Sequence, residues 1–408
     1  MGKIVKGMSI FPLFSKKSTP ITATTTFFPL QFLAGYINQG LNANQQKFLE
    51  LFLQVPELQA IIGYKARVFA GMNVIAQNDN GDEKTIKQIE IIKKPNPLQN
   101  QKEFLTQYYI LRSIFGNEFI HPVVGANKDN PKALWNLPPM NAEVIPVDMG
   151  KQSIFNMTDI SEVIAGYKFE YDGTKLTYPA DEIIHFNDNQ VVFDKDKLRL
   201  GDSKLRPLVQ PCENIKAAYE ARGILISQGP KGILSNETTD GVGRLDLGAK
   251  EKEDLQEDMR KKYGMTRKKW DVILTNANLK WTSMATDTGK MKLFEEVDAD
   301  FRTIANAFNF PPEILQTDST YENKNKALIQ LYQEAIIPEA NEFLQGLRDW
   351  MGLSEHLVAD FSHIAVLQAD LERRAKSINW AATGLSKAVE TNLTTEKEAA
   401  EEFKKYMS

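Results

Sequence analysis

The chain has 408 residues, of which 42% are hydrophobic and 25% are charged, and its formal net charge is −4. This length and balance are typical of a globular protein with two or three cores, and they exclude a fibrous or wholly disordered chain. The weakly acidic charge also argues against a sequence-specific DNA-binding protein, which would need a strongly basic surface to capture phosphates.

The cysteine count and the hydropathy pattern exclude further classes of protein. Cys212 is the only cysteine, so we expect neither an intrachain disulfide nor a thiolate zinc site, as in a reducing cytoplasm. No run of 18 apolar residues occurs, so we expect no transmembrane span and no membrane partner. The first 26 residues mix lysines with an apolar patch that is too short for a secretory signal, and we interpret them as a flexible arm.

The first part of the chain predicts helices and one hairpin. Apolar residues at helical spacing predict helices over 45–53 and 55–72. Asn80 and Gly81 predict the turn between a short strand over 72–76 and a polar return strand. A further helix with its apolar residues at helical spacing follows and stops at Gly116.

The next part alternates apolar and polar residues and therefore reads as strands. The predicted strands cover 118–124, 133–137, 143–146, 164–171 and 183–186. Beyond them, an apolar stripe from Leu208 to Ile226 predicts a helix, which Gly229 and Pro230 end. A compact α/β insert follows, with a helix over 250–263 and strands over 232–235, 270–274 and 279–282.

Two long helices and a corner dominate the region from 293 to 350. The first carries an apolar stripe from Leu293 to Phe308 and must end at Pro311 and Pro312, because two consecutive prolines remove two backbone donors. The second is predicted to open near Asn323 or Asn325 and to kink at Pro338. The remaining chain to 408 is predicted to be helical and charged.

Several short motifs stand at the ends of these elements. They are Pro95-Asn96-Pro97, Gly116-Asn117-Glu118, Trp135-Asn136-Leu137-Pro138-Pro139, Tyr178-Pro179-Ala180-Asp181-Glu182, Gly201-Asp202-Ser203-Lys204-Leu205, Phe310-Pro311-Pro312 and Tyr321-Glu322-Asn323. As an ordered series over about 43–350, they resemble the HK97-like portal proteins of tailed bacteriophages. Lys204 departs from that family, which usually has a proline there.

The resemblance implies an α+β fold of the portal type, a multi-part subunit with an α+β wing, a helical stem, a small α/β clip and a helical C-terminal region. The expected parts are a flexible N-terminal arm (1–26), the wing (27–200), the first stem helix (201–228), the clip (229–287), the second stem helix (288–313), the tunnel loop (314–323), a long kinked wing helix (324–351) and a helical C-terminal wing or crown region (352–408).

The resemblance also implies a function and partners. A ring homo-oligomer, expected to be a dodecamer, would sit at one capsid vertex of the virion after assembly in the host cytoplasm, and double-stranded DNA would be packaged and ejected through it without sequence specificity. Expected partners are the terminase large subunit, a head-tail connector or adaptor, and the major capsid or scaffolding protein. Twelve copies at −4 each would carry about −48, so the wall would repel phosphates and let a duplex slide.

Two segments are candidate functional sites. The polar connection between the two long helices would project toward the channel axis as a tunnel loop, and the alternative is an ordinary helix connection. Its candidate residues are Gln316, Thr317, Asp318, Ser319, Thr320, Tyr321, Glu322 and Asn323. In the clip, a charged helix would dock partners, and the alternative is a solvated amphipathic helix. Its candidate residues are Lys250, Glu251, Glu253, Asp254, Glu257, Arg260 and Lys261.

Enzymatic readings find little support in the sequence. No Gly-x-x-x-x-Gly-Lys-Ser/Thr motif occurs, which argues against a packaging ATPase. The histidines lack metal-ligand spacing, and His185, on an apolar strand, reads as a core or interface residue rather than a catalytic base. We therefore expect no catalytic residue, cofactor or metal. An α+β host enzyme with an unrecognised site and a head-to-tail adaptor protein stay open as alternatives.

Overall fold

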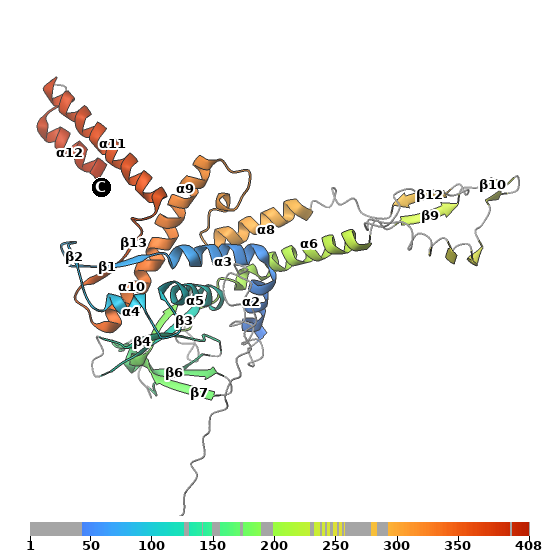
Figure 1. Ribbon diagram of the computed structural model, residues 1–408, viewed down its shortest axis with the longest axis horizontal. Helices are drawn as coiled ribbons and strands as arrows, with labels where there is room; N and C mark the ends of the chain where they lie inside the picture. Colours follow the sequence, from blue (N-terminus) through green and yellow to red (C-terminus); the bar gives the residue numbers. More distant parts are fainter. Residues whose placement is uncertain are drawn as a thin grey trace, which may run out of the picture.

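A computed structural model describes residues 43–407 except 126–129, 141, 149–155, 172–173, 189–198, 229–231, 237–238, 241–242, 245–247, 251–252, 255–256, 258–278, 284–292 and 392–393. Helices and strands form a body from which two helical arms project on opposite sides (Figure 1). The mixed α+β class predicted from the sequence is confirmed.

Helices α2 (Ala43–Gln54), α3 (Pro56–Phe69) and α5 (Gln101–Phe115) lie in the body, with the short α4 (Ile89–Lys93) beside them. Asn100 and Glu103 form a capping box at the start of α5. Gly116 ends α5 at φ +69°, and a Cβ atom there would lie 2.3 Å from the carbonyl oxygen of Asp202. Only glycine fits this position, and the predicted helix end is confirmed.

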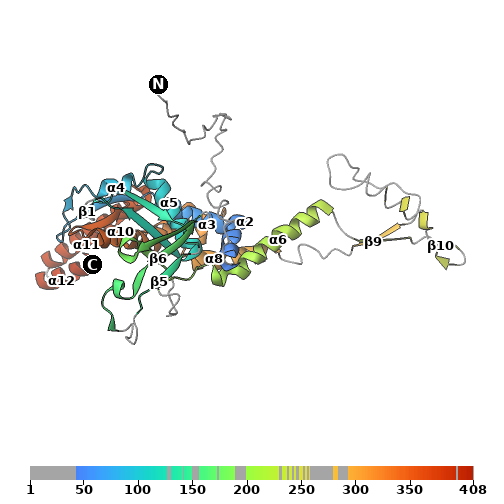
Figure 2. The same cartoon turned by 90° about the horizontal axis from the view of Figure 1, so that it is seen from below.

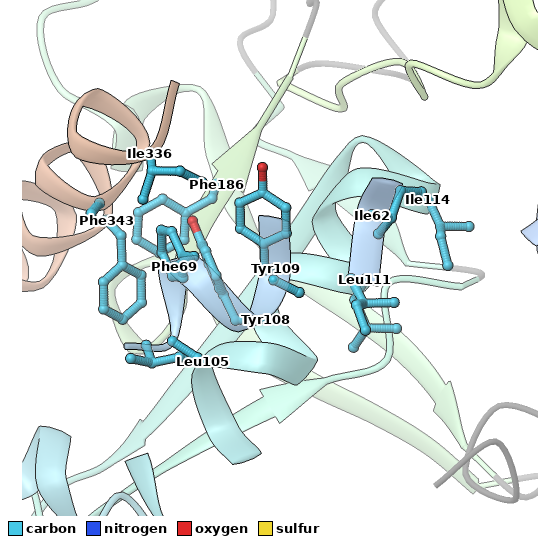
Figure 3. Close-up of a cluster of buried hydrophobic side chains, with 14 of the residues drawn as sticks. Ile62, Phe69, Leu105, Tyr108, Tyr109, Leu111, Ile114, Phe186, Ile336 and Phe343 are labelled. Carbon is cyan, nitrogen blue, oxygen red and sulfur yellow. The ribbon is translucent and has the colours of Figure 1, made fainter. Parts of the chain in front are cut away.

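The main core lies where α3, α5, strand β8 (Ile184–Asn187) and the long helix α10 (Ile337–Met351) meet. Figure 3 shows its aromatic centre, in which the Tyr108 ring lies 4.7 Å from the Phe343 ring and 5.2 Å from the Phe186 ring, between centroids. These rings pack mostly edge to face, the arrangement that aromatic quadrupoles favour. Residues from both halves of the chain therefore share one core.

Strand β1 (Asn73–Gln77) forms the predicted hairpin with β2 (Glu83–Lys84), and Gly81 in its turn has φ +83°. On its other side β1 pairs with β13 (His356–Asp360), in the register Asn73 opposite Asp360. The sequence analysis predicted only helix after residue 352, so β13 is a correction. Its five residues alternate too briefly to stand out against the charged helices that follow.

Two further sheets build the lower part of the body in Figure 1. In the first, β3 (Asn117–Val123) lies between β4 (Ala133–Leu137) and β8 (Ile184–Asn187). In the second, β6 (Ile164–Tyr171) lies between β5 (Glu143–Pro146) and β7 (Thr174–Pro179). The strand β7 was not predicted, because its residues are mostly exposed and show only weak apolar alternation. Between the two sheets lies a second core around Phe119, Tyr167 and Phe169.

Helices α6 (Val209–Gln228) and α8 (Leu293–Ala307) project from the body side by side, as both views show (Figures 1 and 2). Beyond the far end of α6 lie the paired strands β9 (Gly232–Asn236) and β12 (Leu279–Ser283), and the pair β10 (Thr239–Asp240) and β11 (Gly243–Arg244). The strands predicted over 232–235 and 279–282 are confirmed. The strand predicted over 270–274 lies outside the described residues.

The last third of the chain is mainly helical. A short 3-10 turn, η6 (Pro312–Ile314), follows α8, and α9 (Tyr321–Leu331), the π-helical turn η7 (Tyr332–Ile336) and α10 (Ile337–Met351) then run on without a break. The sequence predicted a kink at Pro338. The structure places the π-helical turn directly before this proline, which then lies in the first turn of α10. Helices α11 (Ala365–Glu390) and α12 (Glu396–Met407) form the second projecting arm.

Short 3-10 turns connect several of these elements, namely η2 (Ile160–Glu162), η3 (Ala180–Glu182) and η5 (Arg206–Leu208). The last of these leads into α6. Ser203, interpreted from the sequence as a helix-cap residue, does not cap α6 itself. Its hydroxyl accepts the amide N–H of Leu205 at 3.0 Å and donates to the carbonyl of Ile114, so it fixes the turn before η5 to the end of α5.

Candidate functional site

The end of α8 is built as a closed helix terminus. Asn309 has φ +48°, and the amide of Phe310 donates to the carbonyl of Ala305 at 2.8 Å while the amide of Asn309 donates to the carbonyl of Asn306. This pair of bonds satisfies carbonyls that a helix end leaves open. Phe310 is then buried, with its ring edge against Tyr64 of α3. The corner predicted at Pro311 is therefore fixed firmly to the body.

A buried lysine ties this corner to two other helices. The Lys65 ammonium, on α3, donates to the carbonyl of Phe308 at 2.7 Å and lies 3.1 Å from the Glu339 carboxylate of α10. The same carboxylate accepts the Tyr109 hydroxyl at 2.6 Å. Burial lowers the pKa of Lys65, and Glu339 opposes that shift. The end of α8 is therefore joined to α3, α5 and α10 through one side chain.

Sequence reasoning missed Lys65, although a signal for it existed. Lys65 lies on the buried stripe of α3 that includes Leu58, Ile62 and Phe69, where a charged residue breaks the pattern. A lysine at such a position is buried with partners of its own.

The tunnel-loop candidates divide between a connection and a helix. The structure contradicts the prediction that the loop runs through Asn323, because α9 begins at Tyr321. The reason is the hydroxyl of Thr320, which accepts the amide of Asn323 and caps the helix. Tyr321, Glu322 and Asn323 form the first turn of α9, and the connecting residues Gln316, Thr317, Asp318, Ser319 and Thr320 precede it.

The charges of this segment are not equivalent. Glu322 pairs with Lys326 at 2.8 Å on α9, and this bond lowers the pKa of Glu322. Asp318 is exposed and precedes the helix. Tyr321 is 82% exposed, so it braces nothing within the subunit. Asp318 is therefore the acidic side chain of the connection itself.

A second polar cluster lies beside the aromatic core. The Arg112 guanidinium of α5 contacts Asp188 at 2.7 Å and Glu342 of α10 at 2.8 Å, and it also donates to the Tyr108 hydroxyl. Lys204, which stands where the portal family usually has proline, pairs with Asp188 at 3.3 Å. These groups line a cavity of about 120 Å³. The cluster joins α5 and α10 to the segment that leads into α6.

The docking candidates of the insert are described only in part. Lys250, Glu253, Asp254 and Glu257 are exposed and helical, which agrees with the predicted helix. Glu251, Arg260 and Lys261 lie outside the described residues.

Two buried titratable residues, Glu118 and His185, lie on the neighbouring strands β3 and β8. His185 of β8 is a core residue, as predicted, and its ring hydrogen-bonds to Asn117 at 3.1 Å and to the Tyr167 hydroxyl at 3.3 Å. Burial lowers the pKa of His185 well below its usual range. Glu118 is fully buried, and neither of its carboxyl oxygens has a hydrogen-bond partner in the described part of the chain.

Glu118→Gln should stabilise the subunit at neutral pH. Burial raises the pKa of the Glu118 carboxyl well above its usual range, so the folded state holds the proton more tightly than the unfolded chain. The stability of the parent should therefore fall as pH rises above about 4.3, by up to about 1.4 kcal/mol per pH unit until the folded-state pKa is passed. Urea unfolding at pH 5 and pH 8 should show the variant's advantage growing with pH.

The matched control is Glu170→Gln, which changes an exposed carboxylate on β6. It should shift the urea midpoint equally at both pH values. If Glu118→Gln behaves like this control, the buried carboxyl has a partner that offsets its desolvation.

Among the described residues, no group of three or more histidine, cysteine or acidic side chains is placed to hold a metal ion. Within the same residues, no helix has the length and apolarity that crossing a bilayer requires.

Comparison with known proteins matches this arrangement to one family. The family model described as "Phage portal protein" matches residues 56–399. The neck of an empty gene transfer agent particle, solved with C6 symmetry, contains a chain with a TM-score of 0.62 and 20% identity, covering 81% of this chain and 88% of that one. The neck of the native particle, solved with C12 symmetry, contains a chain with a TM-score of 0.62 and 19% identity, covering 83% and 89%.

Two more distant similarities were also found. A crystal structure described as an HK97 family phage portal protein from Corynebacterium diphtheriae has a TM-score of 0.46 and 13% identity, covering 76% of this chain and 93% of that chain. An uncharacterized protein of Rickettsia felis is 22% identical over 286 residues, which are 68% of this chain and 69% of that protein. The family match spans the body from α3 onward, the helices α6 and α8, all of α11 and the start of α12, and this chain therefore belongs to the phage portal protein family, whose general function is to form a channel for DNA.

Proposed function

We propose that this portal protein assembles into a closed ring of twelve copies at a capsid vertex of the virion. The observation that supports the ring is the pair of helices α6 and α8. This pair extends from the body, and no other helix in the described part of the chain covers its far part (Figure 2). Tyr219 and Ile224 of α6 are 43% and 50% exposed in the single subunit. Closed cyclic symmetry would bury such apolar side chains against the next copy without leaving open ends.

In this proposal the parts take the roles that the sequence predicted. The helices α6 and α8 are the stem around the duplex, and the β9–β12 region is the clip, which docks the terminase large subunit during packaging and the head-tail connector afterwards. The α+β body and the arm of α11 and α12 form the wing and crown, which meet the capsid or scaffolding protein. The ring supplies the passage, and the terminase supplies ATP hydrolysis.

The proposal predicts a species many times heavier than the 46.2 kDa subunit. Sizing chromatography with light scattering over a range of concentrations should detect it, and negative-stain images should show rings with a central opening. Tyr219→Lys should weaken the ring, because it would place a charge in the proposed interface. Lys397→Ala, at an exposed position of α12, is the matched control. A protein that stays monomeric at every concentration, also with scaffolding protein added, would argue against the ring.

A further inference from the structure

A cleft of about 550 Å³ lies where the turn after β1, the helix α10 and the strand β13 meet. These elements lie on the side of the body away from α6 and α8 (Figure 1). One wall is a face of α10 with Asn341, Gln345 and Arg348, and the opposite wall includes Leu357 of β13. The cleft is therefore separate from α6 and α8 and from the connection that precedes α9.

Arg348 gives the cleft its chemistry. Its Nε atom is buried without a hydrogen-bond partner, and in the described part of the chain this side chain forms no ion pair. The neighbouring carboxylates are already engaged. Asp79 lies 3.1 Å from the His356 ring, and Glu355 lies 3.5 Å from the Lys84 ammonium. A guanidinium held in this state has unused donors, which an incoming acceptor would satisfy.

The strand wall adds a backbone donor. The amide of Ala359 donates to the Asn341 side chain at 3.0 Å, so it points away from β1. In an antiparallel pair the direction of the amides alternates along the strand, so the amide of Leu357, two residues earlier, points to the same side. Leu357 lines the cleft. An extended chain in the cleft could therefore pair with the edge of β13.

We propose that this cleft binds an extended, acidic segment of a partner protein. A glutamate or aspartate carboxylate would accept two parallel hydrogen bonds from Arg348, the geometry in which arginine binds most specifically. A backbone carbonyl of the same segment would accept from the Leu357 amide, as in strand addition at a sheet edge. A singly charged carboxylate suits the site better than a phosphate, because Asp79 lines the cleft and repels a second negative charge.

The probe for this binding experiment is a fluorescein-labelled peptide, Thr-Val-Glu-Val-Glu-Thr. A control peptide replaces both glutamates with glutamine. Fluorescence anisotropy with the full chain should show saturable binding of the acidic peptide and at least tenfold weaker binding of the control. Arg348→Gln should weaken the acidic peptide about tenfold or more, and Arg348→Lys should weaken it less, since lysine keeps the charge but loses the fork. Arg206→Gln, at an exposed arginine elsewhere, should leave binding unchanged.

Hydrogen exchange tests the position of the peptide through a backbone amide and not through a charged side chain. Binding should slow exchange at the Leu357 amide, and Arg348→Gln should abolish that protection. Equal binding of the two peptides, or binding that Arg348→Gln leaves unchanged, would overturn the proposal. Tighter, Arg348-dependent binding of inorganic phosphate or of a short DNA duplex would also overturn it, as would an Arg348→Gln effect on self-association, which would assign the cleft to a second copy. The peptide, phosphate and DNA results do not bear on the ring.

Discussion

Lys65→Met should destabilise the subunit by about 3–5 kcal/mol, the range expected when one partner of a buried ion pair is removed. Methionine fills a similar volume, but it leaves the Glu339 carboxylate facing the core with only the Tyr109 hydroxyl, and it leaves the Phe308 carbonyl without its donor. Urea unfolding followed by circular dichroism measures the loss. Because Phe308 directly follows the last residue of α8, hydrogen exchange at the amides of Asn309, Phe310 and Glu313 to Leu315 should also accelerate.

The matched control makes the same substitution at an exposed ion pair. Lys326 pairs with Glu322 on α9, with both side chains more than 60% exposed, so Lys326→Met should change stability by less than about 1 kcal/mol. Lys65→Met with Glu339→Gln should recover part of the loss, because the double variant no longer buries an unpaired charge. Similar losses for Lys65→Met and Lys326→Met would mean that the buried lysine does not hold the corner.

The elements that the sequence predicted well are those whose signals are local. The end of α5 needs only Gly116, the hairpin needs only Asn80 and Gly81, and the corner needs only Pro311 with its neighbour. Each of these residues imposes its backbone geometry without help from distant parts of the chain. Their positions in the structure match the predictions because nothing in the tertiary fold competes with them.

The elements that were missed depend on partners far away in sequence. The strand β13 exists because β1, nearly 300 residues earlier, offers it an edge, and its buried residues Leu357 and Ala359 join the core beneath α10. A five-residue segment that starts with histidine and ends with aspartate carries too little pattern to reveal this pairing. For the same reason, the motif residues of the family could be located from sequence, whereas the ion pairs of Arg112 and Lys65 could not.

The start of α9 shows how a small error in one boundary changes a functional hypothesis. The loop predicted through Asn323 placed Asp318, Tyr321 and Glu322 together in one connection toward the channel axis. The Thr320 cap separates them, since it puts Glu322 on a helix with Lys326 to balance its charge. A test that deleted Thr320 would therefore unfold the first turn of α9 as well as remove the loop. The decisive test must leave Thr320 in place and change Asp318.

Asp318→Lys should reduce the yield of DNA-filled particles about tenfold in an in vitro packaging reaction. In the proposed ring this change puts a cationic side chain on every copy of the connection, where a passing duplex would bind and release its counterions instead of sliding. The defect should lessen as salt is raised, because phosphate contacts are screened. Ring formation and the urea midpoint should match those of the parent, since Asp318 is exposed and no core residue changes.

Asp349→Lys is the matched control for this experiment, because it makes the same charge reversal at an exposed position of α10. It should package DNA as the parent does. Asp318→Asn should fall between the parent and Asp318→Lys, since it removes a repulsive charge without adding an attractive one. If Asp318→Lys fills and retains full-length DNA like the parent at low salt, the segment from Leu315 to Thr320 is only a helix connection. The channel wall that meets DNA then lies elsewhere on the stem, and the exposed acidic face of α8, with Glu295, Glu296 and Asp298, is the next segment to test by the same reversal.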